Sequence, residues 1–285
     1  MLCEHSFFRT SDGTELHLKY KEHGSPIWLI ATHGIGEHLG RHHYLPELFG
    51  HDFNVFQYDL RAHGRSSGDK SFVPDFGRMI SDLDEIIHYL RKKYKMQRYV
   101  LFGHSMGALI TAAYVQSLKS NDHYPERIVL NAPPVAYTGP VGPLFKLTPL
   151  GFWQKLARIP GSVKLGGMVD LNYLSHYHET KASYEADDLN CLKLHTNLLL
   201  GMVKTSKEVF SRPIRPRCPS YVSVGSDDRI VDVEALKNYF TLVDKSFQLT
   251  VFDGAYHEIH NEIDKYKKPY FDYLKQVLLE CRYDD

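Results

Sequence analysis

Short apolar runs recur along the chain and are separated by longer segments whose apolar residues fall at helical spacing. Runs rich in Val, Ile, Leu and aromatic residues predict buried strands. These predicted strands cover Ile27–Ala31, Phe53–Tyr58, Tyr99–Phe102, Ile128–Leu130, Tyr221–Val224 and Phe247–Phe252. Near the start, Phe7–Arg9 and Leu16–Tyr20 flank the turn Ser11–Gly13, which predicts a hairpin. The pattern therefore predicts eight strands.

Helices are predicted between these strands. Residues 74–95 hold apolar side chains on one helical stripe, which indicates an amphipathic helix. Further helices are expected after Ala108, near 233–242 and over 262–281. Strands that alternate with helices are typical of a mostly parallel sheet covered on both faces. The expected fold class is therefore α/β.

Residues 133–218 interrupt this alternation. The stretch opens with a segment rich in glycine and proline and closes with Arg212–Pro216. Because it lies between two predicted core strands, we expect an insertion over the carboxyl ends of the strands, where open α/β sheets hold their sites. We predict a core of residues 1–132 and 219–285 and a helical cap of residues 133–218 that acts as a lid. The alternative is a helical subdomain without a role in the site.

Composition excludes several classes of function. The chain has 285 residues, with 34 Lys and Arg against 34 Asp and Glu, so no basic field attracts nucleic acid. The four cysteines have no CxxC spacing and predict free thiols. The 17 histidines lack metal-ligand spacing, so neither a metal nor a cofactor is expected. The N-terminus lacks a signal sequence, and no stretch is apolar enough to span a membrane, which favours a cytoplasmic protein.

The segment Gly103–Gly107 follows a predicted strand and precedes a predicted helix, with Ser105 at its centre. A nucleophile elbow holds its serine in a strained turn and leaves no room for side chains two positions away. The spacing of the two glycines fits this requirement. We interpret Ser105 as the nucleophile of a serine hydrolase, the alternative being a structural turn that caps a helix.

An acid and a base follow Ser105 in the chain. Asp228 comes after the predicted strand 221–224, and His257 comes after the predicted strand 247–252. The order serine, aspartate, histidine, each just past a strand, is that of the α/β-hydrolase triad. Asp227 and His260 are the alternatives on the same two loops. Asp228 is preferred because an apolar helix start follows it, and His257 because it comes first after its strand.

The oxyanion of an acyl-transfer reaction needs two backbone N–H donors. One is expected from Met106, the residue after the nucleophile, and the other from the loop that follows the strand Ile27–Ala31. Glycines at 34 and 36 free that loop to approach a substrate. Ile35 is therefore the predicted second donor.

With these motifs in view, the chain resembles the monoacylglycerol lipase and lysophospholipase branch of the α/β-hydrolases. The segments that carry the resemblance are His33–Arg41, Asp59–Gly68, Gly103–Gly107, Gly225–Arg229 and Ala255–Glu262. Within the cap only Tyr184–Leu189 is similar to the family. The resemblance implies an α/β-hydrolase fold, the triad Ser105, Asp228 and His257, and an oxyanion hole at Ile35 and Met106.

The resemblance also implies a substrate. In monoacylglycerol lipases the positions that match Glu37, Arg41 and His260 hold the glycerol head group, and all three residue types are present. The alternative is a surface salt bridge beside an unrelated histidine. The expected reaction is cleavage of a monoacylglycerol to fatty acid and glycerol. Lysophospholipase, broad carboxylesterase or thioesterase, and serine aminopeptidase activities remain alternatives.

A patch of apolar residues from Leu144 to Trp153 in the predicted cap is a further candidate for function. We expect it to make transient contact with a membrane or micelle and to admit lipid. The alternative is that these side chains belong to the core. The sequence leaves the oligomeric state, the acyl-chain length and the mobility of the cap undetermined.

Overall fold

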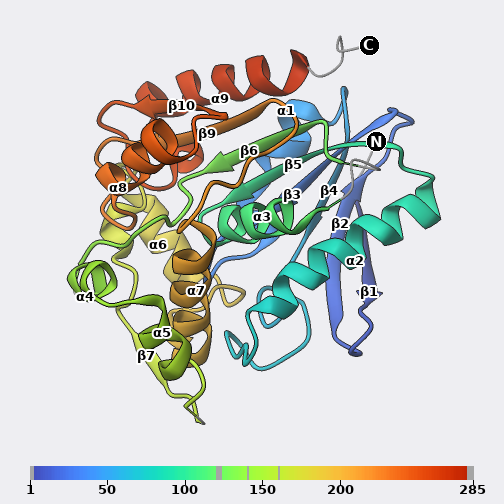
Figure 1. Ribbon diagram of the computed structural model, residues 1–285. Coiled ribbons are helices and arrows are strands. Elements are labelled where there is room, and N and C mark those ends of the chain that lie inside the picture. The colour runs from blue at the N-terminus through green and yellow to red at the C-terminus, as the bar shows by residue number, and fades with distance from the viewer. Residues whose placement is uncertain (1–2, 120–123, 140, 160, 281–285) are drawn as a thin grey trace.

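The computed structural model describes residues 3–119, 124–139, 141–159 and 161–280. Eight strands form one sheet in the order β1-β2-β4-β3-β5-β6-β9-β10 (Figure 1). They are β1 (Glu4–Arg9), β2 (Glu15–Lys21), β3 (Ile27–Thr32), β4 (Asn54–Tyr58), β5 (Arg98–His104), β6 (Arg127–Asn131), β9 (Ser220–Gly225) and β10 (Phe247–Phe252). The pairs β1–β2 and β2–β4 are antiparallel and all other neighbours are parallel. The predicted eight-stranded, mostly parallel sheet is confirmed.

The central strands are buried on both faces, as continuous apolar runs require in a parallel sheet. One apolar core lies under α2 (Gly77–Tyr94), α3 (Met106–Ser117) and α8 (Val233–Asn238). A second core lies on the other face under α1 (Tyr44–Phe49) and α9 (Asp264–Leu279) (Figure 1). The short helices η1 (Leu39–His42), η3 (Tyr239–Val243) and η4 (Ile259–Asn261) join these elements.

Helix α2 has the predicted apolar stripe, with Met79, Leu83 and Ile86 fully buried. It begins at Gly77, later than the predicted residue 74, because Asp75 Oδ1 accepts a hydrogen bond from the Gly77 N–H and ends the preceding loop. It ends where Lys95 adopts a left-handed backbone (φ 55°). Helix boundaries therefore follow local hydrogen bonds, whereas the helix itself follows its apolar stripe.

The chain leaves the sheet after β6 and returns at β9, and we call the intervening residues 133–218 the cap. It contains α4 (Val141–Leu147), α5 (Leu150–Leu156), η2 (Leu171–Tyr173), α6 (Glu179–Ala186) and α7 (Thr196–Val209). It also contains a two-stranded sheet of β7 (Lys164–Gly166) and β8 (Lys193–His195), which the sequence reading missed. Each of these strands has only three residues, too few for a recognisable alternation.

Helix α7 of the cap packs against both the core and the other cap helices. Its residues Leu198, Met202 and Val209 belong to the same apolar core as α3. On another side, Val203 packs with Phe145 and Trp153 of the cap. Figure 1 shows the cap helices gathered at one end of the sheet, beside α7. In the described part of the chain no helix is both long and apolar enough to serve as a membrane span.

Candidate active site

Ser105 lies in a sharp turn between β5 and α3, with φ 53° and ψ −118°. This backbone region is strained for a residue with a side chain. A Cβ atom at Gly107 would lie 2.2 Å from the Thr32 carbonyl oxygen, and one at Gly103 would lie 2.6 Å from the Gly107 carbonyl oxygen. Only glycine fits at these two positions. The turn thereby presents Ser105 at the carboxyl edge of the sheet.

The structure brings Ser105, His257 and Asp228 together. His257 Nε2 lies 3.0 Å from Ser105 Oγ, and His257 Nδ1 lies 2.6 Å from Asp228 Oδ2. All three residues are buried. A serine, an imidazole and a carboxylate in this hydrogen-bonded sequence can activate the hydroxyl for nucleophilic attack.

Asp228 is held by its own backbone surroundings. Its Oδ1 accepts hydrogen bonds from the N–H groups of Ile230 (2.8 Å) and Val231 (3.1 Å), which leaves Oδ2 for His257. Asp227, the alternative, is exposed and its carboxylate bonds Ser226. The geometry therefore separates the two neighbouring aspartates: only Asp228 contacts the imidazole.

The loops that carry Asp228 and His257 lie side by side because β9 and β10 are parallel neighbours. Gly225 ends β9, and a Cβ atom there would lie 2.1 Å from the Ala255 carbonyl oxygen. A side chain at this position would push the histidine loop away from the aspartate loop. Gly225 thus sets the short distance between the acid and the base.

Charge around His257 favours its protonated form. Burial lowers the pKa of His257, but the Asp228 carboxylate beside it, with smaller contributions from Glu258 and Glu37, raises the pKa, so that the net pKa lies above the ordinary value. His104, whose ring centre lies 5.0 Å away, is different because burial lowers its pKa to about 3. His104 is therefore neutral, and its Nδ1 lies 2.7 Å from Asn131 Oδ1.

The two predicted oxyanion donors flank Ser105. Met106 is the first residue of α3, and Ile35 lines the same cavity as Ser105. His33 fixes the backbone of the Ile35 loop: its Nδ1 lies 2.8 Å from the Gly34 carbonyl oxygen, and its Nε2 lies 2.9 Å from the Leu60 nitrogen. Since a backbone N–H can only donate, Nε2 accepts and Nδ1 carries the proton. This loop is therefore held in place ahead of any substrate.

Glu37 and Arg41 form a buried ion pair. Arg41 Nε lies 3.3 Å from Glu37 Oε2, and the two side chains are 9% and 3% exposed. Glu37 Oε1 also accepts hydrogen bonds from the Gly34 N–H and from His42 Nε2. Burial raises the pKa of Glu37, but the neighbouring His42, His104 and Arg41 hold it well below its usual range. The alternative of a surface salt bridge is wrong, because these charges lie inside the protein.

His260, the third predicted head-group residue, does not line the cavity that contains Ser105. Its ring packs 4.7 Å from the His42 ring and 5.1 Å from the Tyr44 ring, measured between ring centres. Neither ring nitrogen has a hydrogen-bond partner among the described residues. Burial holds the pKa of His260 well below its usual value, so the ring is neutral. The structure places His260 behind His42 and His104, away from the nucleophile.

The sequence analysis assigned no role to two residues of the site, Glu258 and Tyr184. Glu258 accepts a hydrogen bond from Arg41 Nη2, and Asn261 Nδ2 lies 2.8 Å from the same carboxylate oxygen. Tyr184 donates its hydroxyl hydrogen to the Gly36 carbonyl oxygen (2.7 Å), and the Arg41 guanidinium lies 4.7 Å from the centre of its ring. A charged residue directly after His257 was the available signal for Glu258.

The cavity beside Ser105 is small, about 30 Å³, which is about the space of one water molecule. Apolar cap residues close it: Val169, Leu171 and Leu174. A second cavity of about 370 Å³ lies next to it under the cap and shares Ile35, Val169, Leu171 and Tyr184 with it. The space directly beside Ser105 is therefore narrower than an ester substrate requires.

The cap residues Tyr173 and Leu174 are hydrogen-bonded to the histidine loop through their backbone carbonyl oxygens. The Glu258 N–H donates to the Leu174 carbonyl oxygen (2.8 Å), and the His257 N–H donates to that of Tyr173 (3.4 Å). Nearby, the buried Glu262 carboxylate lies 2.7 Å from His176 Nδ1. These contacts join the cap directly to the catalytic loop.

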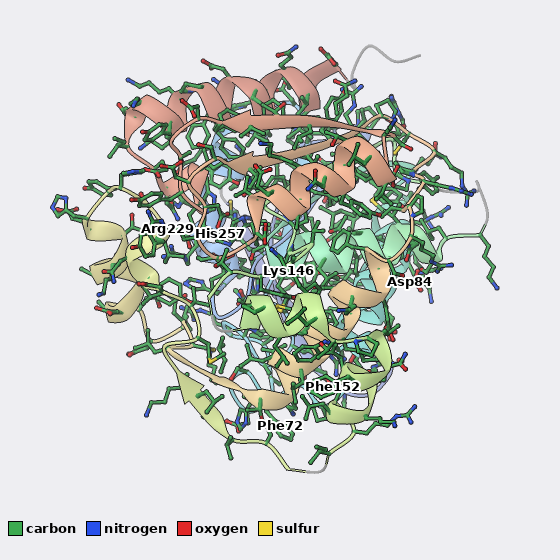
Figure 2. The ribbon with its side chains drawn as sticks, turned by 60° about the vertical axis from the view of Figure 1, so that its left-hand side comes forward. Phe72, Asp84, Lys146, Phe152, Arg229 and His257 are labelled. Carbon is green, nitrogen blue, oxygen red and sulfur yellow. The ribbon has the colours of Figure 1, made fainter. Side chains whose placement is uncertain are left out.

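Arg229 adds a contact at the border between core and cap, where Figure 2 also shows His257. Arg229 Nη1 donates to the Tyr173 hydroxyl (3.2 Å), and its guanidinium lies 4.6 Å from the centre of that ring. Because Arg229 follows Asp228 in the chain, the acid loop is also tied to the cap.

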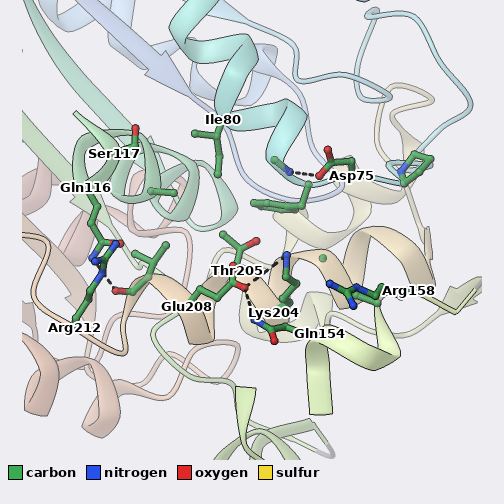
Figure 3. Close-up of a pocket in the computed structure, with 17 residues that line it drawn as sticks. Asp75, Ile80, Gln116, Ser117, Gln154, Arg158, Lys204, Thr205, Glu208 and Arg212 are labelled. Carbon is green, nitrogen blue, oxygen red and sulfur yellow. Dashed lines mark hydrogen bonds and ion pairs between the residues drawn. The ribbon is translucent and has the colours of Figure 1, made fainter. Parts of the chain in front are cut away.

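A larger cavity of about 590 Å³ lies elsewhere, between α2, α3, α5 and α7 (Figure 3). It shares no residue with the cavity at Ser105. Glu208 on its wall lies 3.2 Å from Gln154 Nε2 and 3.7 Å from Lys204 Nζ. The described residues contain no group of three or more His, Cys, Asp and Glu side chains that could hold a metal ion.

The fold and the site together define an α/β-hydrolase of the lipase and esterase type. A family profile described as serine aminopeptidase, S33, matches residues 27–264. Human monoglyceride lipase is 30% identical over 263 residues, which cover 89% of this chain and 83% of that protein. The chain belongs to this family of α/β-hydrolases, in its monoacylglycerol lipase branch.

Two other comparisons extend this result. An uncharacterized Escherichia coli protein, YnbC, is 27% identical over 264 residues, which are 90% of this chain; the match spans only 44% of YnbC. The crystal structure of a soluble variant of Saccharomyces cerevisiae monoglyceride lipase, in complex with a substrate analog, shares the fold with a TM-score of 0.80 at 18% identity. That likeness covers 99% of this chain and 96% of the yeast chain.

Proposed function

We propose that the protein hydrolyses the carboxylic ester of a monoacylglycerol to fatty acid and glycerol through an acyl-enzyme intermediate. The observation that carries this proposal is the hydrogen-bonded sequence Ser105, His257 and Asp228 on an elbow at the carboxyl edge of the sheet. Membership in the monoacylglycerol lipase branch supports the choice of substrate.

In the first step Ser105 Oγ attacks the ester carbonyl carbon while His257 Nε2 takes the hydroxyl proton. Asp228 keeps the other imidazole proton on Nδ1 and stabilises the imidazolium that forms. The N–H groups of Ile35 and Met106 stabilise the oxyanion. His257 then gives its proton to the leaving alcohol oxygen, and the carbon–oxygen bond to the alcohol breaks.

In the second step water hydrolyses the acyl-enzyme. His257 removes a proton from the water, the new hydroxyl oxygen bonds to the acyl carbon, and the bond to Ser105 Oγ breaks. The proton on His257 returns to Ser105. The fatty acid leaves and the resting enzyme is restored.

The head group and the acyl chain need separate places. Glu37 lines the cavity at Ser105 and offers a carboxylate to hydroxyl groups, with Arg41 behind it. His260 enters this proposal only as support for that wall, since it packs on His42. The neighbouring cavity of about 370 Å³ is the proposed place of the acyl chain.

The test compares the wild-type chain with Ser105→Ala on monoacylglycerols and lysophospholipids of several chain lengths. Ser117→Ala, on an exposed serine of the same helix α3, is the matched control. We expect release of fatty acid and glycerol by wild type and by the control, and none above background by Ser105→Ala.

Other outcomes would change the proposal in defined ways. Faster cleavage of lysophospholipid would replace the glycerol ester as the substrate. Cleavage of p-nitrophenyl butyrate alone would leave a carboxylesterase, and cleavage of prolyl naphthylamide would favour an aminopeptidase. Full activity in Ser105→Ala would overturn the serine mechanism.

Membrane contact through the cap is part of this proposal. Leu147 and Phe152 are 85% and 41% exposed, and Figure 2 shows Phe152 on the cap, whereas Trp153 is buried. Exposed apolar side chains on a lid are typical of proteins that bind lipid surfaces. We expect Leu147→Ser with Phe152→Ser to weaken binding to phosphatidylcholine vesicles in a flotation assay, while hydrolysis of a water-soluble ester stays unchanged. Unchanged flotation would remove this part of the proposal.

A further inference from the structure

The wall of the cavity at Ser105 has an uneven distribution of charge. Among the described residues that line it, Glu37 and Glu258 carry carboxyl groups, and neither lysine nor arginine is present. Both glutamates are 2% exposed. A substrate placed against Ser105 therefore meets two carboxyl groups and neither lysine nor arginine in the described lining of its site.

Arg41 contacts both carboxylates from outside the lining of the cavity. Its Nη2 donates to Glu258, and its Nε lies 3.3 Å from Glu37 Oε2. No described donor gives a hydrogen bond to Glu37 Oε2, although this oxygen is buried. A single guanidinium, which does not itself line the cavity, thus serves two carboxylates that do.

Two of the neighbouring histidines add no positive charge to this wall. Burial lowers the pKa of His104 to about 3 and holds that of His260 well below its usual value. His42 Nε2 lies 3.0 Å from Glu37 Oε1, and His42, like Arg41, does not line the cavity. The two glutamates, and not Arg41 or His42, therefore border the space that a substrate enters.

Both carboxylates lie near the imidazole of His257, because each of them raises its pKa. His257 Nε2 delivers the proton to the leaving oxygen, so the alcohol lies on the imidazole side of the scissile bond. Glu258 follows His257 directly, and its N–H is fixed by the Leu174 carbonyl oxygen. Both glutamates belong to the core, and core residues hold their carboxylates: Arg41 and Asn261 for Glu258, and the Gly34 N–H and His42 for Glu37.

We propose that Glu258, together with Glu37, makes the leaving-group side of this cavity selective by charge. Esters of cationic alcohols, such as quaternary amino alcohols, are cleaved faster than their neutral isosteres, and esters of anionic alcohols are cleaved more slowly. The neutral glycerol head group lies between these extremes. This inference rests on the proposed ester hydrolysis and names the class of leaving group that the same site prefers.

The physical basis is the weak screening of charge in a closed site. Two charges a few ångströms apart interact several times more strongly at the low effective dielectric of a protein than in water. A quaternary ammonium group forms no hydrogen bonds with water, so burying it costs less than burying a primary ammonium. The two carboxylates that border the cavity therefore favour the cation and oppose an anion.

The experiment uses three butyryl esters of similar size: the choline ester, the neutral 3,3-dimethylbutyl ester and the anionic 3-sulfopropyl ester. In wild type we expect kcat/KM for the choline ester to exceed that for the neutral ester by about tenfold, and the anionic ester to be slower than the neutral one by a similar factor. Added salt should reduce both ratios.

Glu258→Gln tests the assigned residue, because glutamine keeps an oxygen for Arg41 and Asn261. We expect the ratio between the choline and neutral esters to fall to within about twofold of one, because one of the two carboxylate charges at the cavity is removed. Asp188→Asn removes the same charge from an exposed position of the cap that does not line the cavity, and should leave the ratio unchanged.

The outcomes separate this inference from the proposed function. Equal kcat/KM for the choline and neutral esters, or an unchanged ratio in Glu258→Gln, would overturn the charge selectivity while ester hydrolysis stands. If no ester is cleaved in a manner that depends on Ser105, the proposed function fails. Calorimetry with choline and with 3,3-dimethylbutanol then decides the inference: tighter binding of choline supports it, and equal binding overturns it.

Discussion

The two walls of the catalytic cavity are built in different ways. The core wall, formed by Ser105, His257, Glu37 and Glu258, is held by hydrogen bonds and ion pairs that leave each side chain one position. The cap wall is formed by Val169, Leu171, Leu174 and Tyr184, and of these four only Tyr184 has a polar side-chain group, a hydroxyl that bonds the Gly36 carbonyl oxygen. Directional contacts fix where the core side chains lie, whereas apolar contacts can be exchanged for contacts with a substrate. We therefore propose that the core wall carries the chemistry and that the cap wall controls access.

The strongest way to break the core wall is to change the partner of the imidazole. Asp228→Asn keeps the shape but favours the wrong histidine tautomer, and we expect kcat to fall by about 10⁴-fold. Asp227→Asn is the matched control, because that side chain is exposed and does not contact His257. Steady-state kinetics on a soluble ester give kcat for both variants. Equal losses in the two variants would contradict the geometry.

The pH dependence of kcat/KM sharpens the role of the same contact. His257 accepts a proton only when neutral, and Asp228 raises its pKa above the ordinary value of 6.5. Activity should therefore fall as the pH is lowered, with a midpoint above 6.5 and about tenfold loss per pH unit below it. A rate profile between pH 5 and pH 9 checks this, at about the range where histidine titrates. An acid limb with its midpoint below 6.5 would contradict the direction of the shift.

The cap wall should respond more weakly and in a different parameter. Leu171→Ala removes apolar volume between the two cavities, and we expect the preference among acyl chains to shift by about 10- to 200-fold at most, with little loss on short esters. Thr148→Ala, a change at a cap residue outside both cavities, is the control. Kinetics over a series of chain lengths give the result. A uniform loss for all chains would mean that Leu171 positions the catalytic groups.

The smallest expected effect concerns stability. Ser105 has a positive φ, which glycine adopts without strain. Ser105→Gly should therefore be more stable than Ser105→Ala by about 1 kcal/mol in free energy of unfolding. Both variants lack the nucleophile, so catalysis does not enter the comparison. Urea unfolding of the pair measures the difference, and equal stability would show that the elbow is unstrained.

The core wall was largely predictable because its signals are local. The strand, the elbow Gly103–Gly107 and the loops with Asp228 and His257 each have short patterns tied to the ends of strands. The topology of a parallel sheet then brings these ends to one edge. The chain order of the three residues therefore predicted their meeting.

Contacts between distant segments could not be derived in this way. Glu258 and Arg41 are separated by 217 positions, and no spacing links them. His260 was expected to hold the head group, but its ring packs against both His42 and Tyr44, a contact that requires η4 to lie beside η1 and α1. The patch Leu144–Trp153 divides into exposed and buried residues for the same reason, since its partners lie on α7.

The backbone bonds between the cap and the histidine loop offer a way to observe the proposed lid movement. If the cap opens as proposed, the amide of Glu258 loses its acceptor on Leu174, and the amide of His257 loses its acceptor on Tyr173. Exchange of these two hydrogens with deuterated solvent therefore counts openings of the cap directly. The same event frees the backbone next to the imidazole of His257. Entry of a substrate and release of the base then follow one equilibrium, which hydrogen exchange at these two amides reports.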